Sequence, residues 1–325
     1  MFVLSGCRRR VASIESSIST GRCSEALQAL NAKKASRKLE ENTDYLRAVC
    51  FLAESRDIFK ARQSLLEELR LFPENVDARL LLNEVNSSAR PLLMPPEEVV
   101  KSEPLFGLLC DALLDHTMLT WTRLYSLYRL VKEVCTKGTH SSALIECGVS
   151  GGGSVVLMAV VAAHYSSGKR RIYALDTFSG MPDPATFDQL DEGGMRIPAA
   201  ETSWGCGTCF ATEENVRRLA RNFGVEDSVV TVPGLFSDTL PLVLEEAGSG
   251  GVAMLHADAD WYASTKCALE CTWPAIIQGG VVQVDDYHYW LGCRKAVDEF
   301  VLKKDHGGSL LLQNVDNNAV YFIKP

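Results

Sequence analysis

No apolar run in this sequence approaches the ~20 residues that a membrane-spanning helix needs, so we expect no membrane segment. Excess positive charge is also lacking. The formal net charge of −8 argues against a nucleic-acid partner, because nonspecific binders need a basic surface to displace counterions from phosphate. The 11 cysteines lack regular spacing, which favours reduced thiols over a disulfide framework and indicates a cytoplasmic location. Small molecules or proteins are therefore the favoured partners.

The first part of the chain has the apolar spacing of helices. From about 15 to 86, apolar residues recur every three or four positions without strand-like alternation. Residues 21–30 and 56–65 align with an offset of 35 residues, close to the ~34-residue period of tetratricopeptide repeats. A tetratricopeptide-like unit is one interpretation. A plain helical bundle appended to an enzyme is the other, since ~3 repeats are normally needed for stability.

Prolines and small polar residues between 86 and 98 interrupt this pattern, so we place the domain boundary there. The predicted division is a helical domain and linker over 1–94 and a second domain over 95–325. We expect the helical domain to pack separately and to contribute no ligand to a metal or cofactor, because it has no acidic strand-end cluster. It is a candidate binding surface for a protein partner, and a homo-oligomer is a candidate assembly.

Beyond residue 140 the pattern changes to short apolar, β-branched runs that alternate with helical stretches. This alternation is typical of a parallel sheet covered by helices on both faces. Residues 309–324 hold two such runs joined by DNN, which is a hairpin signal. We therefore predict an α/β fold with a doubly wound, mostly parallel sheet and an antiparallel last strand, preceded by an all-α domain.

In such sheets ligands bind beyond the carboxyl ends of the strands. One strand ends in Glu146 and a glycine-rich turn, ECGVSGGGS, where missing side chains let a ligand approach the backbone and the next helix. Asp176 follows the last glycine by 23 residues, near the ~20-residue spacing at which an acid meets a ribose. The spacing is not GxGxxG, and an acid at 146 suits an ammonium group, which favours S-adenosylmethionine over NAD. A tight turn with a helix N-cap is the structural alternative.

Carboxylates also end two later strands. Asp258 follows the run GVAML, and Asp285 and Asp286 follow the run VVQV. Adjacent strand ends lie ~5 Å apart, so these three carboxylates should converge. Without a partner they would repel one another, and a hard divalent cation with oxygen ligands is the natural partner. The alternative is a solvated acidic rim that caps the following helices.

Five stretches together resemble the macrocin O-methyltransferase (TylF-type) family of S-adenosylmethionine- and magnesium-dependent sugar O-methyltransferases. They are TMLTWTRLYSLYRLV, IECGVSGGGS, ALDTFSGMPDP, HADADWYAST and DDYHYWLGCRKAVDEF, in consistent order over about 115–325. The resemblance implies a class I methyltransferase-like fold, with S-adenosylmethionine and Mg²⁺ as cofactors.

By that resemblance Glu146, Gly148 and Asp176 fall on cofactor positions. With the glycine turn and the other strand ends, the expected cofactor-binding residues are Glu146, Gly148, Gly152, Asp176, Thr177 and Gly234, and the expected metal ligands are Asp258, Asp285 and Asp286. One departure stands out. Where family members commonly show an aromatic and a basic residue before the double glycine, this chain has Ser150 and Gly151.

Residues 180–212 are too polar and too broken to belong to the sheet, and a segment of this length is usually a lid or a binding loop. Trp204 and Phe210 are candidates for an apolar wall around the acceptor. Cys206 and Cys209 form an isolated CxxC, which is a weak sign of zinc and is better explained as incidental thiols.

The predicted function is transfer of a methyl group from S-adenosylmethionine to a hydroxyl of a sugar-like or other small-molecule natural product. A divalent cation would bind the hydroxyl acceptor, and Asp260 or His288 would take its proton as the catalytic base. His256 and His288 beside the acids are equally explained as histidines that carboxylates hold for structural reasons. Two alternatives are a nicotinamide-dependent oxidoreductase and a protein-binding helical scaffold with a vestigial methyltransferase domain.

Overall fold

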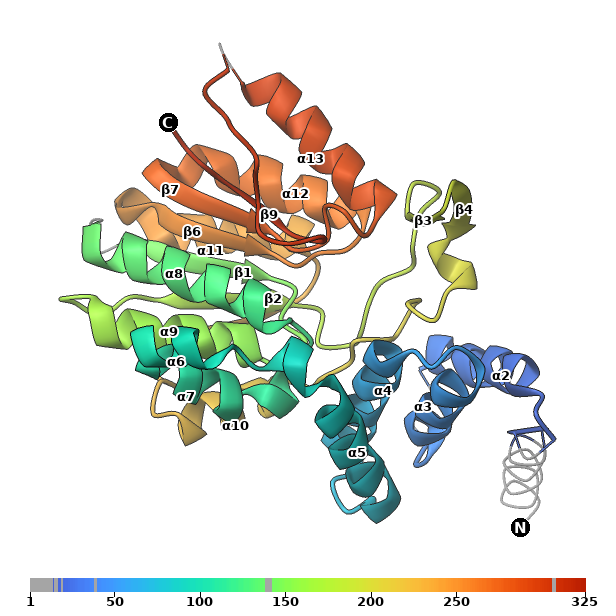
Figure 1. The fold of residues 1–325 in the computed structure, drawn as a ribbon. Helices are drawn as coiled ribbons and strands as arrows, with labels where there is room; N and C mark the ends of the chain where they lie inside the picture. The colour runs from blue at the N-terminus through green and yellow to red at the C-terminus, as the bar shows by residue number, and fades with distance from the viewer. Residues whose placement is uncertain (1–13, 15–16, 19, 38–39, 138–141, 306–307) are drawn as a thin grey trace.

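The fold has a helical part, which carries the N-terminus, and an α/β part, which carries the C-terminus (Figure 1). The computed structural model describes residues 14, 17–18, 20–37, 40–137, 142–305 and 308–325. Within these ranges no helix is both long enough and apolar enough to cross a bilayer.

The helical part is built from consecutive helices that pack against one another. They are α2 (Cys23–Ala35), α3 (Thr43–Glu54), α4 (Ile58–Leu71) and α5 (Val76–Leu93). Ala48, Leu65 and Leu82 are buried in a core that α3, α4 and α5 share. The side chain of Asp57 caps α4 by accepting a hydrogen bond from the Lys60 amide. This arrangement accommodates the tetratricopeptide-like interpretation, and the domain boundary at residue 94 stays a prediction.

Helix α5 extends further than the sequence pattern indicates. It continues through Pro91 to Leu93, so the helical pattern ends several residues after 86. A proline in a helix removes one main-chain hydrogen bond. Ala89 and Leu93, on either side of it, are buried, and their packing keeps the last turns helical.

Three helices lead from there to the sheet: α6 (Glu97–Ser102), α7 (Pro104–Ala112) and α8 (Trp121–Lys137). The main sheet contains β1 (Ala143–Cys147), β2 (Ile172–Asp176), β5 (Val229–Pro233), β6 (Val252–Ala257), β7 (Ile276–Val284), β8 (Gln313–Asn314) and β9 (Val320–Ile323). Its order is β5-β2-β1-β6-β7-β9-β8. The first five strands of this order are parallel, and β9 and β8 pair in the antiparallel sense. The predicted α/β fold is confirmed.

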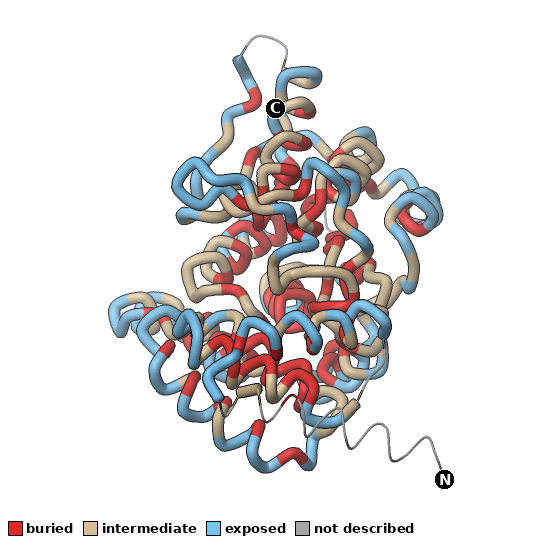
Figure 2. The backbone as a smooth tube through the Cα atoms, turned by 90° about the vertical axis from the view of Figure 1, so that its right-hand side faces the viewer, coloured by how far each residue is buried: buried red, intermediate tan, exposed pale blue. Residues whose placement is uncertain are grey.

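Helices cover both faces of this sheet. On one face α8, α9 (Gly153–Tyr165) and α10 (Glu213–Asn222) share a buried core with the strands. On the other face the core is formed with α11 (Phe236–Ala247), α12 (Tyr262–Thr272) and α13 (Leu291–Lys304). Figure 2 shows the buried backbone concentrated inside the α/β part and between the helices of the helical part. The two-layer covering leaves the ends of the strands as the accessible edge.

The register of the parallel strands brings the predicted site residues to this edge. Glu146 in β1 lies opposite His256 in β6, and β1, β2, β6 and β7 end at similar heights. Residues 180–212 stay outside the main sheet, as expected, and contain a separate hairpin of β3 (Gln189–Glu192) and β4 (Met195–Pro198).

Candidate active site

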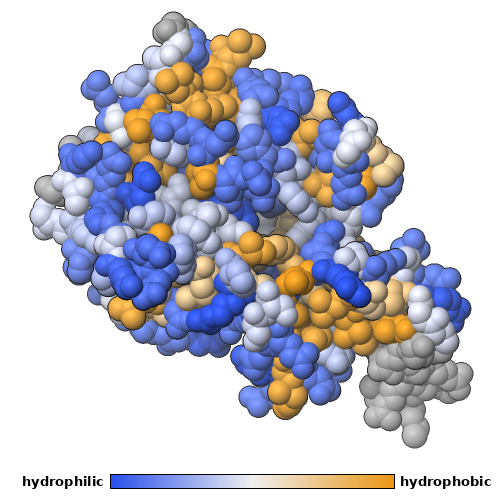
Figure 3. All heavy atoms as spheres, in the orientation of Figure 1, coloured by the Kyte–Doolittle hydropathy of each residue, from blue (hydrophilic) through white to orange (hydrophobic). Residues whose placement is uncertain are grey.

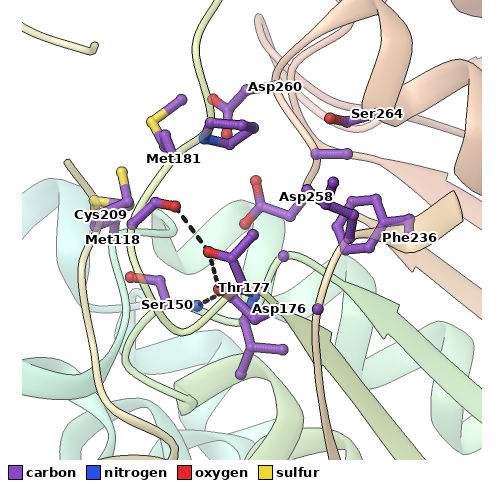
Figure 4. Close-up of a pocket in the computed structure, with 17 residues that line it drawn as sticks. Met118, Ser150, Asp176, Thr177, Met181, Cys209, Phe236, Asp258, Asp260 and Ser264 are labelled. Carbon is purple, nitrogen blue, oxygen red and sulfur yellow. Dashed lines mark hydrogen bonds between the residues drawn. The ribbon is translucent and has the colours of Figure 1, made fainter. Parts of the chain in front are cut away.

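A cleft lies at the carboxyl edge of the sheet, and its space of about 640 Å³ includes a part that is open to solvent. Figure 4 shows side chains from the ends of β2 and β6 pointing toward one another across it. Six of the lining residues carry the argument below: Ser150, Asp176, Thr177, Gly234, Asp258 and Asp260.

The glycine turn between β1 and α9 is shaped by a close approach of two strand ends. Gly148 has a φ of +90°, and a Cβ there would lie 1.8 Å from the carbonyl oxygen of Asp258. Only glycine fits both the backbone conformation and the space. The amides of Val149 and Ser150 donate to Asp176 Oδ2 at 2.8 and 3.1 Å. Asp176 therefore ties the end of β2 to the turn while it lines the cleft.

The expected cofactor residues divide into two groups. Gly148, Asp176, Thr177 and Gly234 line the cleft, and Gly152 turns the chain into α9 behind it. Glu146 lies below the turn with its carboxylate 2.7 Å from His256 Nδ1, and both side chains are fully buried. Burial raises the pKa of Glu146. The structure therefore gives Glu146 a partner within the protein, and its contact with a cofactor stays a prediction.

An acidic cluster occupies the other side of the cleft. Carboxylate oxygens of Asp258, Asp260 and Asp286 lie within 4.8 Å of one another. Burial, and then repulsion among these groups and Asp285, raises the pKa of Asp258 and of Asp286 well above the ordinary value. Among the described residues, Asp286 Oδ2 is buried without a hydrogen-bond partner. Closely spaced oxygens of this kind fit a hard divalent cation, which takes oxygen ligands at about 2.0–2.6 Å.

Asp285 points to a different neighbour than Asp286 does. One of its oxygens pairs with Arg123 of α8, and Asp285 is 2% exposed. Burial opposes the charge on Arg123, but Asp285 and Asp286 outweigh it and raise the pKa of the guanidinium. Consecutive side chains at a strand end point in opposite directions, which separates the two aspartates. Asp285 Oδ1 is buried without a partner among the described residues, so this oxygen stays a candidate ligand.

Only one of the two candidate bases lines the cleft. Strand β6 ends at Ala257, and Asp260 has a φ of +54°, so its side chain no longer follows strand alternation. Its Oδ1 accepts a hydrogen bond from Trp290 Nε1 at 3.0 Å, and burial raises its pKa to about 7. His288 lies outside the cleft lining, with Nε2 2.9 Å from Asn314 Oδ1.

Sulfur-bearing side chains form an apolar wall on one side of the cleft, and Phe236 lines it elsewhere. Met118, Met181 and Cys209 lie together on one side of the cleft (Figure 4). Trp204 is outside the cleft lining and donates from Nε1 to the Tyr289 hydroxyl at 3.0 Å. Met181 and Cys209 therefore contribute to the cleft from segment 180–212, whereas Trp204 and Phe210 do not line it.

Side chains of the helical part hold that segment in place. Arg47 Nη2 donates to the Ser203 carbonyl oxygen at 3.0 Å, and Glu67 Oε1 accepts from the Cys209 amide at 2.9 Å. Glu67 also pairs with Lys34. The charged side chains of Lys34, Arg47 and Glu67 are all buried. The helical part thus contacts the α/β part through buried charge.

These contacts from the helical part were not foreseen from the sequence. One signal was present: Gln63, Glu67 and Arg70 recur along α4 at helical spacing and form a polar face. Arg62, also of α4, contacts the segment before α8, because its Nη1 donates to the Thr117 carbonyl oxygen at 2.8 Å. A polar helix face is usually solvated, so periodicity alone did not identify a contact surface.

Comparisons with known proteins agree on one family. The macrocin-O-methyltransferase (TylF) family model matches residues 71–324. The chain is 32% identical to demethyldecarbamoylnovobiocin O-methyltransferase of Streptomyces niveus over 208 residues, 64% of this chain and 75% of that protein. The same identity and coverage, 32% over 208 residues, relate it to 8-demethyl-8-(2,3-dimethoxy-alpha-L-rhamnosyl)-tetracenomycin-C 4'-O-methyltransferase of Streptomyces olivaceus.

Solved structures extend this similarity to three dimensions. The structure of the O-methyltransferase NovP has a TM-score of 0.53 and 31% identity, and the match covers 64% of this chain and 82% of that chain. The family match begins at Leu71, the last residue of α4, and so leaves α2, α3 and nearly all of α4 outside it.

Proposed function

Because the chain belongs to the macrocin-O-methyltransferase (TylF) family and is an S-adenosylmethionine-dependent O-methyltransferase, we propose that it methylates a hydroxyl of a sugar-like or other natural product. The observation that carries the proposal is the acidic cluster of Asp258, Asp260 and Asp286, which faces the glycine turn across one cleft. One relative is named for demethyldecarbamoylnovobiocin and the other for a rhamnosyl-tetracenomycin, which supports an acceptor of this kind.

The donor side of the cleft is assigned to S-adenosylmethionine. The glycine turn exposes main-chain groups at the start of α9, and Asp176, Thr177 and Gly234 surround the same space. Glycine in the turn lets the cofactor approach the backbone closely. Both lone pairs of Asp176 Oδ2 accept hydrogen bonds from amides of the turn. Oδ1 accepts from the Phe178 amide and has a further lone pair for a ribose hydroxyl.

The acceptor side is assigned to a divalent cation and a hydroxyl. Asp258 and Asp286 would hold the cation, with Asp285 Oδ1 as a further ligand. When bound, Mg²⁺ would lower the pKa of the acceptor hydroxyl and hold it in place. The cluster fits this role because its oxygens are close together and carry raised pKa values, which a cation relieves.

Asp260 is assigned as the base. Its pKa of about 7 suits proton transfer near neutral pH, and Trp290 fixes the carboxylate in the cleft. The proton passes from the acceptor hydroxyl to a carboxylate oxygen of Asp260. The hydroxyl oxygen then forms a bond to the methyl carbon as the carbon–sulfur bond breaks, which leaves S-adenosylhomocysteine.

The helical part is proposed as a surface for a protein partner or a second copy of the chain. Val76, Leu80 and Leu92 are exposed apolar residues of α5, and Figure 3 shows hydrophobic atoms gathered over the helical part. Light scattering of the purified chain measures the assembly directly, and a monomer at high concentration would remove the second-copy assignment.

Methyl transfer from labelled S-adenosylmethionine to a panel of glycosylated acceptors tests the main proposal. We expect Asp258→Asn to abolish most turnover and Mn²⁺ binding measured by electron paramagnetic resonance. S-adenosylhomocysteine affinity should remain, because the cation acts on the acceptor. Asp227→Asn, at an exposed site in the same domain, is the matched control. Full activity of Asp258→Asn, or of the wild type in excess chelator, would show that the acidic cluster is a solvated rim and holds no catalytic cation.

A further inference from the structure

Arg70, in the last turn of α4, joins the glycine turn to segment 180–212. Its Nη1 lies 3.3 Å from Ser150 Oγ and 3.2 Å from the Phe210 carbonyl oxygen, and it can donate to both. Nη2 is buried and has no hydrogen-bond partner among the described residues. A cation from the helical part therefore stands directly behind a residue that lines the cleft.

The guanidinium occupies the space that a side chain at Gly151 would need. A Cβ on Gly151 would lie 2.3 Å from Arg70 Nη2 and 2.6 Å from the His116 carbonyl oxygen. The φ of Gly151 is not left-handed, so space and not backbone conformation requires glycine here. The positive charge at this point of the turn arrives from α4.

The charge of Arg70 has no direct ion-pair partner among the described residues. The nearest carboxylate along the helix, Glu67, is engaged by Lys34 and by the Cys209 amide. Burial lowers the pKa of Arg70, although Glu67 and Asp176 act in the opposite direction and favour its charge. A buried, unpaired cation costs stability, and replacing such a group by an apolar one of similar volume is often neutral or stabilising. The hydrogen bonds to Ser150 and Phe210 need a donor at this place but not a full charge, so they do not explain the charge of Arg70.

A ligand with a negative charge would explain the positive charge of Arg70 at this place. The turn opens α9, and main-chain N–H groups at a helix N-terminus attract anions. In S-adenosylmethionine the carboxylate of the amino-acid end is the anionic group. Arg70 adds a full positive charge beside this helix end and fixes Ser150, which faces the cleft.

We propose that Arg70 is a positioning residue for the cofactor: it holds the glycine turn against segment 180–212, and its charge favours the carboxylate of S-adenosylmethionine. The proposal rests on the placement of the cofactor at the glycine turn. It makes the helical part a contributor to the cofactor site, contrary to the expectation that this part packs separately. Arg70 lies outside the family match over 71–324, so this contribution is a feature of the helical extension.

Calorimetry on the full chain tests the proposed role of Arg70 with two ligands, S-adenosylhomocysteine and 5′-methylthioadenosine. The second ligand lacks the amino-acid end. In Arg70→Met we expect affinity for S-adenosylhomocysteine to fall about threefold or more, because a positive charge near the bound carboxylate is lost. Affinity for 5′-methylthioadenosine should change less than about twofold. Arg70→Lys, which keeps the charge, should recover much of the loss. Arg79→Met, on the exposed face of α5, is the control.

Thermal unfolding of the same variants separates binding from stability. The melting temperature of Arg70→Met should equal or exceed that of the wild type, because an unpaired buried charge has gone. If Arg70→Met does not fold, Arg70→Gln replaces it with the same expectations. Equal losses for both ligands, or no loss for either, would overturn the role of Arg70. Failure of the wild type and of Arg79→Met to bind S-adenosylhomocysteine would instead overturn the proposed cofactor site, and this proposal with it.

Discussion

Replacing Asp260 by asparagine should stabilise the metal-free protein while it removes the proposed base. The carboxylate lies among Asp258, Asp285 and Asp286, and burial raises its pKa from 3.8 to about 7. Asparagine keeps an oxygen that can accept the hydrogen bond from Trp290 Nε1 and carries no charge. The variant therefore loses the cost of ionising this position and retains its shape.

The direction and size of the expected change in stability follow from the raised pKa of Asp260 in the folded protein. The folded protein binds this proton more tightly than the unfolded chain, so the free energy of unfolding falls as pH rises from about 4 to about 7. A pKa of about 7 in place of 3.8 corresponds to about 4 kcal/mol at pH 8. Neighbouring aspartates share this cost, since their pKa values are raised too, so we expect Asp260→Asn to gain about 2–4 kcal/mol at pH 8. Near pH 4 the gain should vanish.

Urea unfolding in excess chelator at pH 4.5, 6 and 8 measures this gain for the wild type and the variant. Asp227→Asn, at an exposed position, controls for the loss of one negative charge. With Mg²⁺ added at pH 8 the advantage of Asp260→Asn should shrink, because the cation stabilises the ionised cluster of the wild type. A variant no more stable than the wild type at pH 8, or a difference that does not depend on pH, would refute the reasoning.

Three further substitutions test separate parts of the site. Asp176→Ala should weaken S-adenosylhomocysteine binding about tenfold in calorimetry, since the carboxylate holds the glycine turn and faces the cleft, and unchanged affinity would remove it from the site. Asp285→Asn should lower the melting temperature more than Asp298→Asn does, because it leaves the buried Arg123 short of a charge partner, and equal melting temperatures would contradict this. Gly148→Ala should abolish cofactor binding, because its Cβ would lie 1.8 Å from a main-chain oxygen, and wild-type affinity would show that the turn relaxes.

The sequence predicted the edge of the sheet well, for a physical reason. Carboxyl ends of parallel strands meet at one edge, so acids that follow apolar runs, such as Asp176 and Asp258, could be placed together without a structure. The direction of each side chain was harder to predict. Asp285 and Asp286 are neighbours in the chain, yet one faces Arg123 and the other faces Asp258.

Residues supplied by distant helices were missed. Arg70 and Arg123 reach the site from α4 and α8, and nothing local in their helices distinguishes them from solvated arginines. His288 follows the acidic pair in sequence, whereas its side chain lies outside the cleft lining and next to Asn314. Long-range contacts of this kind depend on how helices dock, which periodicity does not encode.

The order of the main sheet places the donor residues and the acceptor residues of the proposed site on different strands. Strands β1, β2 and β5 lie on one side and end at the glycine turn, Asp176 and Gly234, whereas β6 and β7 lie on the other and end at the acids. The chain reverses its direction of winding between β1 and β6, and such a switch point opens a crevice. In the proposed assignment, recognition of the methyl donor and activation of the acceptor would belong to different stretches of sequence. Substitutions at Asp258 or Phe210 would also disturb the donor side, because Asp258 packs against Gly148 and Arg70 joins Phe210 to Ser150.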